Sequence, residues 1–287
     1  MKHYLKLMRI QHWIKNGLIF MPLIFSGLLL NGNLFFRTSL GMISFCFLAS
    51  SVYIVNDIHD VDKDRLHEKK KNRPIASGAI STPKAKIFAI ILLIIASLFN
   101  LLASINIVAW LIFAVYLGIN FLYSVAGWKK IPLLDVIILV VGFFLRILYG
   151  AILTNIDISS WLYLVIISGA FYMGFGKRRN ELSKTAGITR DVLKRYSLDY
   201  LDKNLNVCVT LSIAFYSLWC IEKNGLTNGN LNFLLTVPIL MVIFFKYGLD
   251  VDRDSEGDPV EVILHDKVLI TLIAIFIGAL AIMIYVE

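Results

Sequence analysis

Long apolar runs, separated by short polar segments, constrain this chain more than any other feature of its sequence. Residues 38–56 and 268–284 carry no charged side chain at all, and 58% of the 287 residues are hydrophobic. A soluble domain needs about 45–50% apolar residues, whereas a helix that crosses roughly 30 Å of hydrocarbon needs about 20 of them in sequence. The sequence therefore predicts an integral membrane protein.

Nine apolar runs are long enough to be membrane spans, and we expect each to be helical because a helix satisfies its own backbone polar groups in lipid. They lie near residues 17–31, 38–57, 85–104, 107–124, 132–154, 160–176, 207–223, 232–249 and 268–286. We expect residues 1–287 to form a single all-α transmembrane catalytic domain.

The basic residues test this assignment, because they gather in the loops on the inner side of a membrane. With nine spans, nearly all Lys and Arg fall on the side of the N-terminus, while Arg37 and Lys223 fall on the other side. We therefore expect a cytoplasmic N-terminus and an outer C-terminus, in the inner membrane of a prokaryote. The net charge of +8 then reports orientation, and we expect no nucleic-acid partner.

A strongly charged stretch, NDIHDVDKDRLHEKKKNRP at 56–74, follows the second expected span. If that helix continues past Asp57, then Asn56, Asp60 and Asp64 share one face at i, i+4 and i+8. Carboxylates at this spacing repel each other unless a cation lies between them, and carboxylate and amide oxygens suit Mg²⁺, which also binds substrate phosphates. The spacing predicts a magnesium site built from Asn56, Asp60 and Asp64.

Basic residues follow these acids directly, among them Arg65, Lys70 and Arg73. Acids for a metal beside bases for phosphate are the layout of a diphosphate site. A solvated loop that merely fixes topology is the alternative for such a charge run, but acidic residues contribute little to orientation. We favour the diphosphate site on the cytoplasmic side.

Further polar residues lie at or inside the expected spans. QHWIKN at 11–16 places Lys15 and Asn16 at the membrane boundary, and GKRRNEL at 176–182 contains Lys177 and Arg178. Both clusters are also typical of interfacial anchors.

Arg146 lies within the fifth span, where a guanidinium costs at least a few kcal/mol unless it faces a polar cavity or a partner. Asp135, about three turns earlier on the same helix, is the alternative counter-ion. We favour a polar cavity for Arg146.

The NDIHDVDKD motif and the KxxRPIASG segment at 70–78 resemble the first aspartate-rich motif of the UbiA superfamily of intramembrane prenyltransferases. The segments QHWIKN, LRILYGA (145–151), GKRRNEL and GDPVEVILHDK (257–267) are similar to its decaprenyl-phosphate phosphoribosyltransferase branch, so the resemblance spans essentially the whole chain. It implies nine helices around a cavity open to the cytoplasmic side. It also implies a glycosyltransferase (pentosyltransferase) that moves a 5-phosphoribosyl group from phosphoribosyl diphosphate to a polyprenyl phosphate and releases diphosphate.

Residue roles follow from the same resemblance. Asn56, Asp60 and Asp64 would hold Mg²⁺ on the donor diphosphate, and Asp57 would support them, so that the candidate catalytic residues are Asp57, Asp60 and Asp64. The expected substrate-binding residues are Lys15, Asn16, Arg65, Lys70, Arg73, Arg146, Lys177 and Arg178.

Two alternatives stay open. A prenyltransferase of the same fold would move an isoprenoid from its diphosphate to an aromatic or other acceptor, but such members usually carry a second aspartate-rich motif after the sixth helix. Here that loop begins KRRNEL, and Asp199 and Asp202 match the motif only in part. A transporter would place ionisable residues near the midplane, whereas most charge here lies at one face. The sequence leaves the formation of homo-oligomers open.

Overall fold

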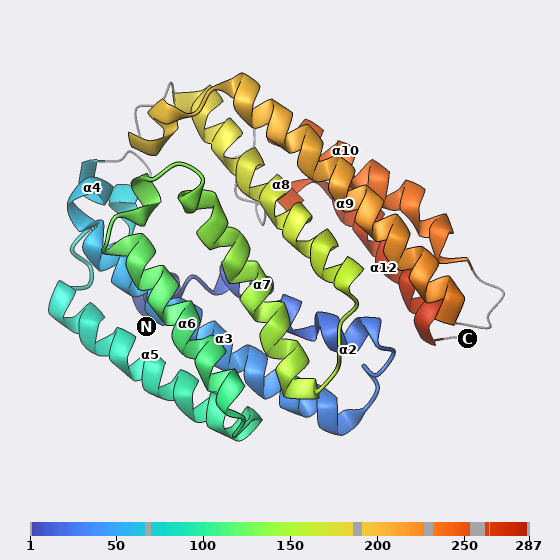
Figure 1. The fold of residues 1–287 in the computed structure, drawn as a ribbon. Helices are drawn as coiled ribbons and strands as arrows, with labels where there is room; N and C mark the ends of the chain where they lie inside the picture. Colours follow the sequence, from blue (N-terminus) through green and yellow to red (C-terminus); the bar gives the residue numbers. More distant parts are fainter. Residues whose placement is uncertain are drawn as a thin grey trace. The chain divides into compact units, whose positions relative to one another are not determined.

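The computed structural model describes residues 2–66, 70–185, 191–226, 232–252, 262–263 and 265–285. Every regular element among these residues is helical (Figure 1). Contacts divide the chain into two compact units. Unit 1 comprises residues 1–24, 28–129 and 145–156, and unit 2 comprises residues 25–27, 130–144 and 157–287.

The first part of the chain contains α1 (Lys2–Met8), η1 (Ile10–Phe20), α2 (Met21–Phe25), α3 (Gly32–His59), α4 (Val61–Leu66), η2 (Lys70–Asn72), α5 (Thr82–Ala103), α6 (Ile107–Ser124) and η3 (Trp128–Lys130). The second part contains α7 (Leu134–Thr154), α8 (Ser160–Thr185), η4 (Asp191–Arg195), α9 (Leu198–Leu226), η5 (Phe233–Thr236), α10 (Val237–Asp252) and α12 (Lys267–Tyr285). The first half of α7 belongs to unit 2 and its second half to unit 1.

Among the described residues, seven helical segments are long and apolar enough to cross a membrane, which supports an integral membrane protein. They are Gly32–His59, Thr82–Ala103, Ile107–Ser124, Leu134–Thr154, Leu198–Gly225, Phe233–Asp252 and Lys267–Tyr285. The expected span at 17–31 is not one helix, because η1 and α2 divide it and Gly27 turns the chain at φ 78°. The expected span at 160–176 lies in α8, whose last turns carry the polar KRRNEL sequence.

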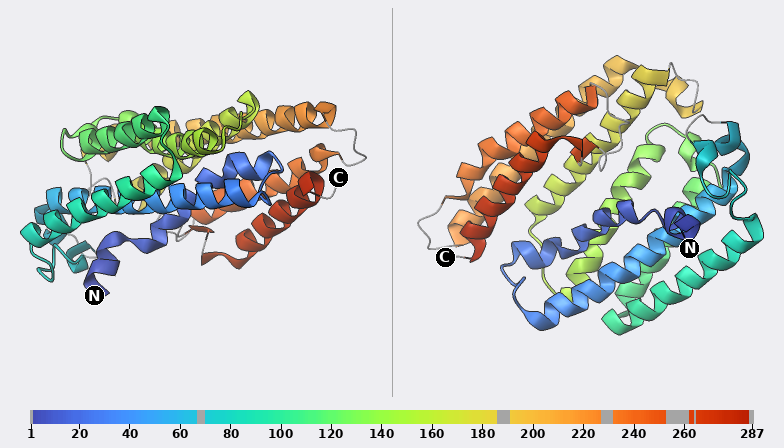
Figure 2. Two further views of the ribbon diagram at one scale, coloured as in Figure 1. Left: turned by 90° about the horizontal axis from the view of Figure 1, so that it is seen from below. Right: turned by 180° about the vertical axis from the view of Figure 1, so that it is seen from behind.

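Helix α3 is the centre of unit 1 and runs antiparallel beside α5 (Figure 2). The buried face of α5 consists mainly of alanines four or seven residues apart, and small residues let two helix backbones approach closely. The short distance between the helices allows hydroxyl groups of α3 to reach the backbone of α5: Ser44 and Ser51 donate to the carbonyl oxygens of Ala96 (2.8 Å) and Ala89 (2.9 Å).

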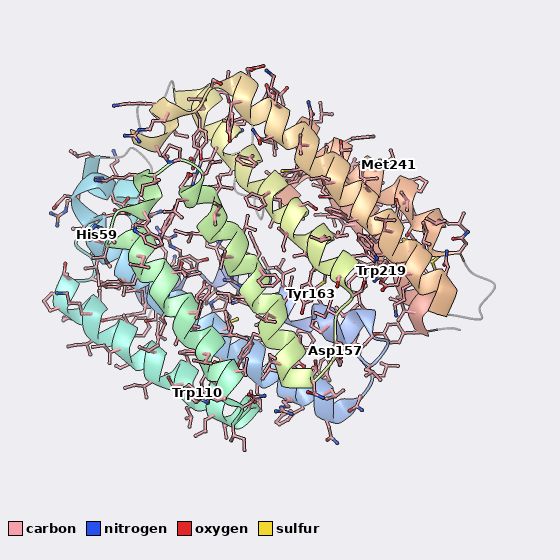
Figure 3. The ribbon with its side chains drawn as sticks, in the orientation of Figure 1. His59, Trp110, Asp157, Tyr163, Trp219 and Met241 are labelled. Carbon is pink, nitrogen blue, oxygen red and sulfur yellow. The ribbon has the colours of Figure 1, made fainter. Side chains whose placement is uncertain are left out.

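Helix α6 runs parallel to α3, because the chain reverses once after α3 and again after α5. Figure 3 shows His59 at the end of α3 and Trp110 near the start of α6, toward opposite ends of unit 1. The two C-terminal ends meet where the Ser124 hydroxyl donates to Asn56 Oδ1 at 3.0 Å. This pairing of helix ends places the charged stretch after α3 beside the loop that follows α6.

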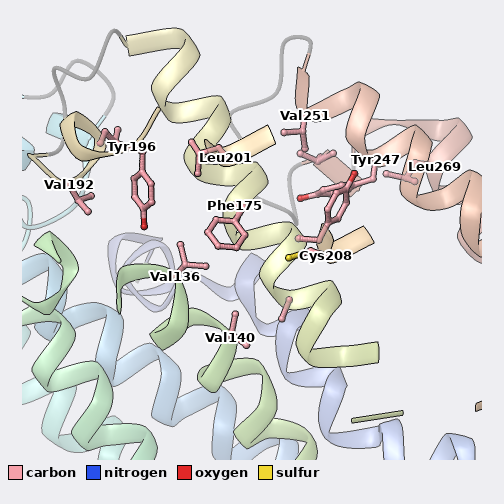
Figure 4. Packing of buried hydrophobic residues seen from close by; sticks show 14 residues of the cluster. Val136, Val140, Phe175, Val192, Tyr196, Leu201, Cys208, Tyr247, Val251 and Leu269 are labelled. Atoms are coloured by element: carbon pink, nitrogen blue, oxygen red, sulfur yellow. The ribbon is translucent and has the colours of Figure 1, made fainter. Parts of the chain in front are cut away.

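Unit 2 is built on α8 and α9, which pack side by side. Ser212 of α9 donates to Ser168 of α8 at 2.9 Å. A cluster of buried apolar residues joins α7, α8, η4, α9, α10 and α12, including Val136, Phe175 and Tyr247 (Figure 4).

Gly150 of α7 and η1 approach each other so closely in unit 1 that a side chain does not fit between them. A Cβ atom on Gly150 would lie 2.0 Å from the carbonyl oxygen of Ile19, whereas a Cβ atom on Gly118 of α6 meets nothing within 4 Å. The close approach fixes the position of η1, which contains Lys15 and Asn16.

We expect Gly150→Ala to destabilise the protein by about 1–3 kcal/mol, because a backbone oxygen cannot yield to the added methyl group as a flexible side chain can. Thermal unfolding in detergent measures this as a lower Tm. The matched control is Gly118→Ala, which we expect to be neutral or stabilising, because alanine forms helices better than glycine. A Gly150→Ala protein as stable as the control would contradict the close contact between η1 and α7.

Candidate functional site

The helix is interrupted inside the charged stretch, at Asp60. Helix α3 ends at His59, Asp60 has φ −94° and ψ 8°, and α4 begins at Val61. The backbone nevertheless keeps its helical hydrogen bonds across the break: Asp60 N–H donates to Asn56 O (2.9 Å) and Asp64 N–H donates to Asp60 O (2.8 Å). Helix α3 therefore continues past Asp57, as a shared face for Asn56 and Asp60 requires, but Asp64 lies on the next helix, α4.

Asp57 and Asp64 meet at one cation. Nη1 of Arg73 lies 3.1 Å from Asp57 Oδ1 and 2.7 Å from Asp64 Oδ2. Arg9, which stands in the left-handed region at φ 52°, forms a second ion pair with Asp57 and lies over the ring of Tyr53. Both carboxylates are buried, at 3% and 4% exposure, so each depends on these guanidinium groups for its charge balance.

Asp60 and Asn56 face a different part of unit 1. The ammonium group of Lys129, in η3, binds both carboxylate oxygens of Asp60 at 2.6 and 2.8 Å. Asn56 Oδ1 accepts from Ser124 at the end of α6. The three expected metal ligands therefore have three different partners, and the described residues contain no group of three acidic, histidine or cysteine side chains that could hold a metal ion.

The site is an alternation of carboxylates and cations at one end of α3. Asp60, Lys129 and Arg73 are each between 17% and 26% exposed, so solvent and small anions reach them although Asp57 and Asp64 are buried. Two carboxylates that converge on one cation match what Mg²⁺ needs from a protein when substrate phosphates supply its other ligands. The donor set of this site therefore fits a divalent ion without a third acid.

The other predicted cations of unit 1 occupy varied surroundings. Arg65 is largely exposed, and its guanidinium lies 3.5 Å from Asp62 and donates to the carbonyl oxygen of Ala76. Lys15 and Lys70 are half-buried, in η1 and η2. The segment containing Lys70 ends at Arg73, whose N–H donates to Lys70 O at 2.9 Å.

Arg146 lies inside unit 1 against polar and aromatic groups. Its Nε donates to Asn16 Oδ1 at 2.7 Å, its Nη2 donates to the Tyr116 hydroxyl at 2.9 Å, and its guanidinium lies over the Tyr116 and Phe45 rings. The structure thus joins Arg146 and Asn16, two residues that the sequence placed 130 positions apart. A guanidinium at this depth is stabilised by these hydrogen bonds and ring faces.

Asp135 is held by a residue other than Arg146. In unit 2, Arg178 Nε donates to Asp135 Oδ2 at 2.5 Å, and Arg178 Nη1 bonds to Glu181 at 2.6 Å. Arg178 and Asp135 are 1% and 0% exposed. The structure therefore places Arg178, expected as a phosphate ligand, in a buried ion pair that ties α8 to the start of α7.

Tyr196 completes this pair. Its hydroxyl donates to Asp135 Oδ1 at 2.8 Å and accepts from the N–H of Leu133, a residue at φ 67°. Burial, with a smaller contribution from the Asp135 hydrogen bond, raises the pKa of Tyr196, so the phenol stays protonated and keeps donating at neutral pH.

The neighbouring residues of the KRRNEL segment are also used in contacts within unit 2. Arg179 pairs with Asp202 of α9 at 2.5 Å and with Asp252 of α10, and Asn180 donates to the carbonyl oxygen of Val251 at 2.7 Å. Lys177 is half-buried in the same helix. Through these contacts the segment, at the end of α8, connects the start of α7, the start of α9 and the end of α10.

Sequence reasoning missed three residues of the site. In the sequence, Arg9 and Lys129 are two of the many basic residues that indicate orientation, whereas in the structure both neutralise acids of the charged stretch. Ser124 carried no signal of its own, since a single serine at a helix end is common. The unbalanced charge of the stretch 56–66, which has more acids than bases, was the signal that cations from elsewhere in the chain must approach it.

The buried ion pair leads to a stability prediction. We expect Arg178→Met to cost about 3–5 kcal/mol, because it leaves the Asp135 carboxylate buried without its cation. The control, Lys203→Met, breaks the exposed pair between Lys203 and Asp199 and should cost less than about 1 kcal/mol. Thermal unfolding in detergent compares the two variants, and equal small losses would mean that the Arg178 pair is open to solvent.

Comparison with known proteins adds to this geometry. The model of the UbiA prenyltransferase family matches residues 19–265. Decaprenyl-phosphate phosphoribosyltransferase of Corynebacterium glutamicum is 29% identical to this chain, over 98% of the chain and 86% of the relative. The protein of the same name from Mycolicibacterium smegmatis is 29% identical, over 98% of this chain and 92% of its own length.

The fold is also similar to that of a solved structure. A UbiA homologue from Archaeoglobus fulgidus, bound to GPP and Mg²⁺, superposes with a TM-score of 0.71 and 18% identity, over 99% of this chain and 100% of the other. At this identity the likeness shows the fold, and the helical architecture predicted from the sequence is confirmed. Because the family model covers most of the residues, this chain belongs to the UbiA prenyltransferase family.

Proposed function

We propose that this protein transfers a 5-phosphoribosyl group from phosphoribosyl diphosphate to a polyprenyl phosphate and releases diphosphate, with Mg²⁺ as cofactor. The observation that carries the proposal is the alternation of carboxylates and cations at the end of α3, where Arg73 and Lys129 each hold an acid and remain partly open to solvent. The names of the relatives that match 98% of the chain support this substrate pair over others.

The charge balance of the site explains how it could receive a diphosphate. Arg73 and Lys129 neutralise Asp57, Asp60 and Asp64. A diphosphate bound with a divalent ion carries both negative and positive charge. The three acids would then pair with the metal ion, and Arg73 and Lys129 would pair with the phosphates. Asn56, Asp60 and Asp64 would hold Mg²⁺, supported by Asp57, which already converges with Asp64 on Arg73, and the metal would neutralise the charge that develops on the leaving diphosphate.

The chemistry asks little else of the protein. Departure of the diphosphate from C1 leaves an oxocarbenium-like ribose, and positioned cations lower the barrier by stabilising the leaving group. The acceptor, a lipid phosphate, is already anionic at neutral pH and needs no general base. Lys15, Asn16, Arg65, Lys70 and Lys177 remain candidate phosphate ligands. Arg146, which holds Asn16, would position it.

The proposal includes the orientation predicted from the basic loops. In it the α3–α4 junction lies on the cytoplasmic side of the inner membrane, the cavity opens to that side, and nine segments cross the bilayer. Transfer of a prenyl group from a prenyl diphosphate is the second candidate, favoured by the fold shared with the GPP-bound homologue.

A two-substrate assay separates these candidates. Purified protein in detergent or nanodiscs, with Mg²⁺, is offered labelled phosphoribosyl diphosphate with polyprenyl phosphate, or labelled prenyl diphosphate with an aromatic acceptor. We expect labelled lipid in the first reaction, and its loss when EDTA removes the metal. Product in the second reaction alone would establish prenyl transfer and sink the proposal.

Substitution of the acids tests the site itself. We expect Asp60→Asn and Asp64→Asn each to lower kcat/KM by at least about a hundredfold, because an amide binds a hard cation far less well than a carboxylate does. The matched control is Asp62→Asn in the same segment, since Asp62 is 90% exposed and its cation lies 3.5 Å away. Full activity in both site variants at ordinary Mg²⁺ concentration would remove the metal assignment.

Lys129 offers a second test with a neighbouring control. We expect Lys129→Met to lower kcat/KM for phosphoribosyl diphosphate by about 10- to 100-fold, the value of one charged hydrogen bond. Lys130→Met removes an equal charge from the next, exposed position and should have little effect. If both variants lose activity equally, the effect comes from net charge at this loop and not from the contact with Asp60.

A further inference from the structure

We propose that α1 and the first turn of α5 together form a surface that binds the anionic headgroups of bilayer phospholipids. This surface, the α1/α5 surface, consists of Lys2, Lys6, Lys84 and Lys86 with the exposed apolar side chains next to them. It lies outside the candidate active site and uses none of its residues.

Packing within unit 1 brings the two short basic segments together. The rings of Tyr4 in α1 and Phe88 in α5 meet edge to face with centroids 4.8 Å apart. Leu7 of α1 shares a buried cluster with Ala85 and Ala89 of α5. Because Tyr4 of α1 touches Phe88 of α5 and both helices border one buried cluster, the lysines of α1 lie near those of the first turn of α5.

The charge of this region is not balanced within the described part of the chain. Lys2, Lys84 and Lys86 are exposed and have no ion-pair partner among the described residues, while Lys6 donates to the backbone oxygen of Asn72. Neither helix has an acidic residue in its first turn. Lysines at the start of α5 also lie at the positive end of the helix dipole. An external anion would therefore offset both the repulsion among the lysines and their unfavourable interaction with the dipole.

The depth of this surface in the bilayer indicates which anion it binds. Helix α5 is long and apolar enough to cross a membrane, so its first turn lies where the lipid headgroups are. Further along α5, Ile87 and Ile90 are about 60% exposed, and Leu5, which precedes Lys6 in α1, is 47% exposed. Basic side chains above apolar ones match a headgroup over its acyl chains, whereas a soluble anion or acidic protein would leave the apolar side chains in water.

A local probe can test this surface. Ser81 is exposed just before α5, and the three native cysteines are buried, so a Ser81→Cys protein takes one fluorophore beside the lysines. The labelled protein is placed in nanodiscs that contain trace headgroup-nitroxide phosphatidylglycerol or phosphatidylcholine. The ratio of quenching by the two lipids measures the local enrichment of the anionic lipid.

We expect enrichment of phosphatidylglycerol around the native surface, and at least a fivefold loss of this preference in Lys84→Gln/Lys86→Gln, since each lysine near an anionic membrane contributes about fivefold. Arg195→Gln/Lys203→Gln removes the same charge from exposed positions in unit 2 and should keep the preference. In the protein that keeps its native lysines, raising the salt concentration should also weaken the preference for phosphatidylglycerol. This measurement tests the proposal even if the Lys84→Gln/Lys86→Gln variant does not fold.

Two results would overturn the proposal. One is a quenching ratio in Lys84→Gln/Lys86→Gln equal to that of the native surface. The other is full displacement of phosphatidylglycerol by millimolar glycerol phosphate, which would show that the surface recognises a free phosphate and not a lipid.

Discussion

Two buried carboxylates that share one guanidinium hold the end of α3 together. Asp57 and Asp64 lose their hydration on folding, and ion pairs with Arg73 and Arg9 offset that cost. The consequences reach through unit 1. Arg9 directly precedes η1, Arg73 directly follows η2, and the two acids lie in α3 and α4, so separate stretches of the chain meet at these ion pairs.

The same physics explains why such an arrangement suits a reaction with diphosphate. In the proposed function, a carboxylate neutralised by a partly exposed lysine or arginine exchanges that cation for a metal, and the released cation binds a phosphate. The buried pair of unit 2 contrasts with this design. Arg178 and Asp135 are almost fully enclosed, with Tyr196 on the remaining oxygen, so that pair holds helices together and has no exposed side for a ligand.

Sequence reasoning anticipated the membrane character, the helical fold and the family, because these depend on composition and on motifs that are local in the chain. It also identified Arg146 as a residue that needs a polar partner. It did not identify the partner: Asp135 was the nearest acid on the same helix, but the structure gives Arg146 the amide of Asn16 and the hydroxyl of Tyr116. Spacing along one helix did not predict the partner, because η1, α3 and α6 all supply neighbours of Arg146.

The sequence by itself determined which residues are charged, that most of them lie outside the apolar runs, and that acids and bases alternate after α3. The length of an apolar run and the charge of a segment do not depend on which other segments pack against it, so the sequence alone is enough to determine them. The tertiary structure alone decided that Asp60 faces Lys129, that Asp57 and Asp64 share Arg73, and that Arg178 is buried. Those outcomes depend on which helix ends meet and on the kink at Asp60, because desolvation forces each buried charge to take the nearest opposite charge in space, wherever it lies in the chain.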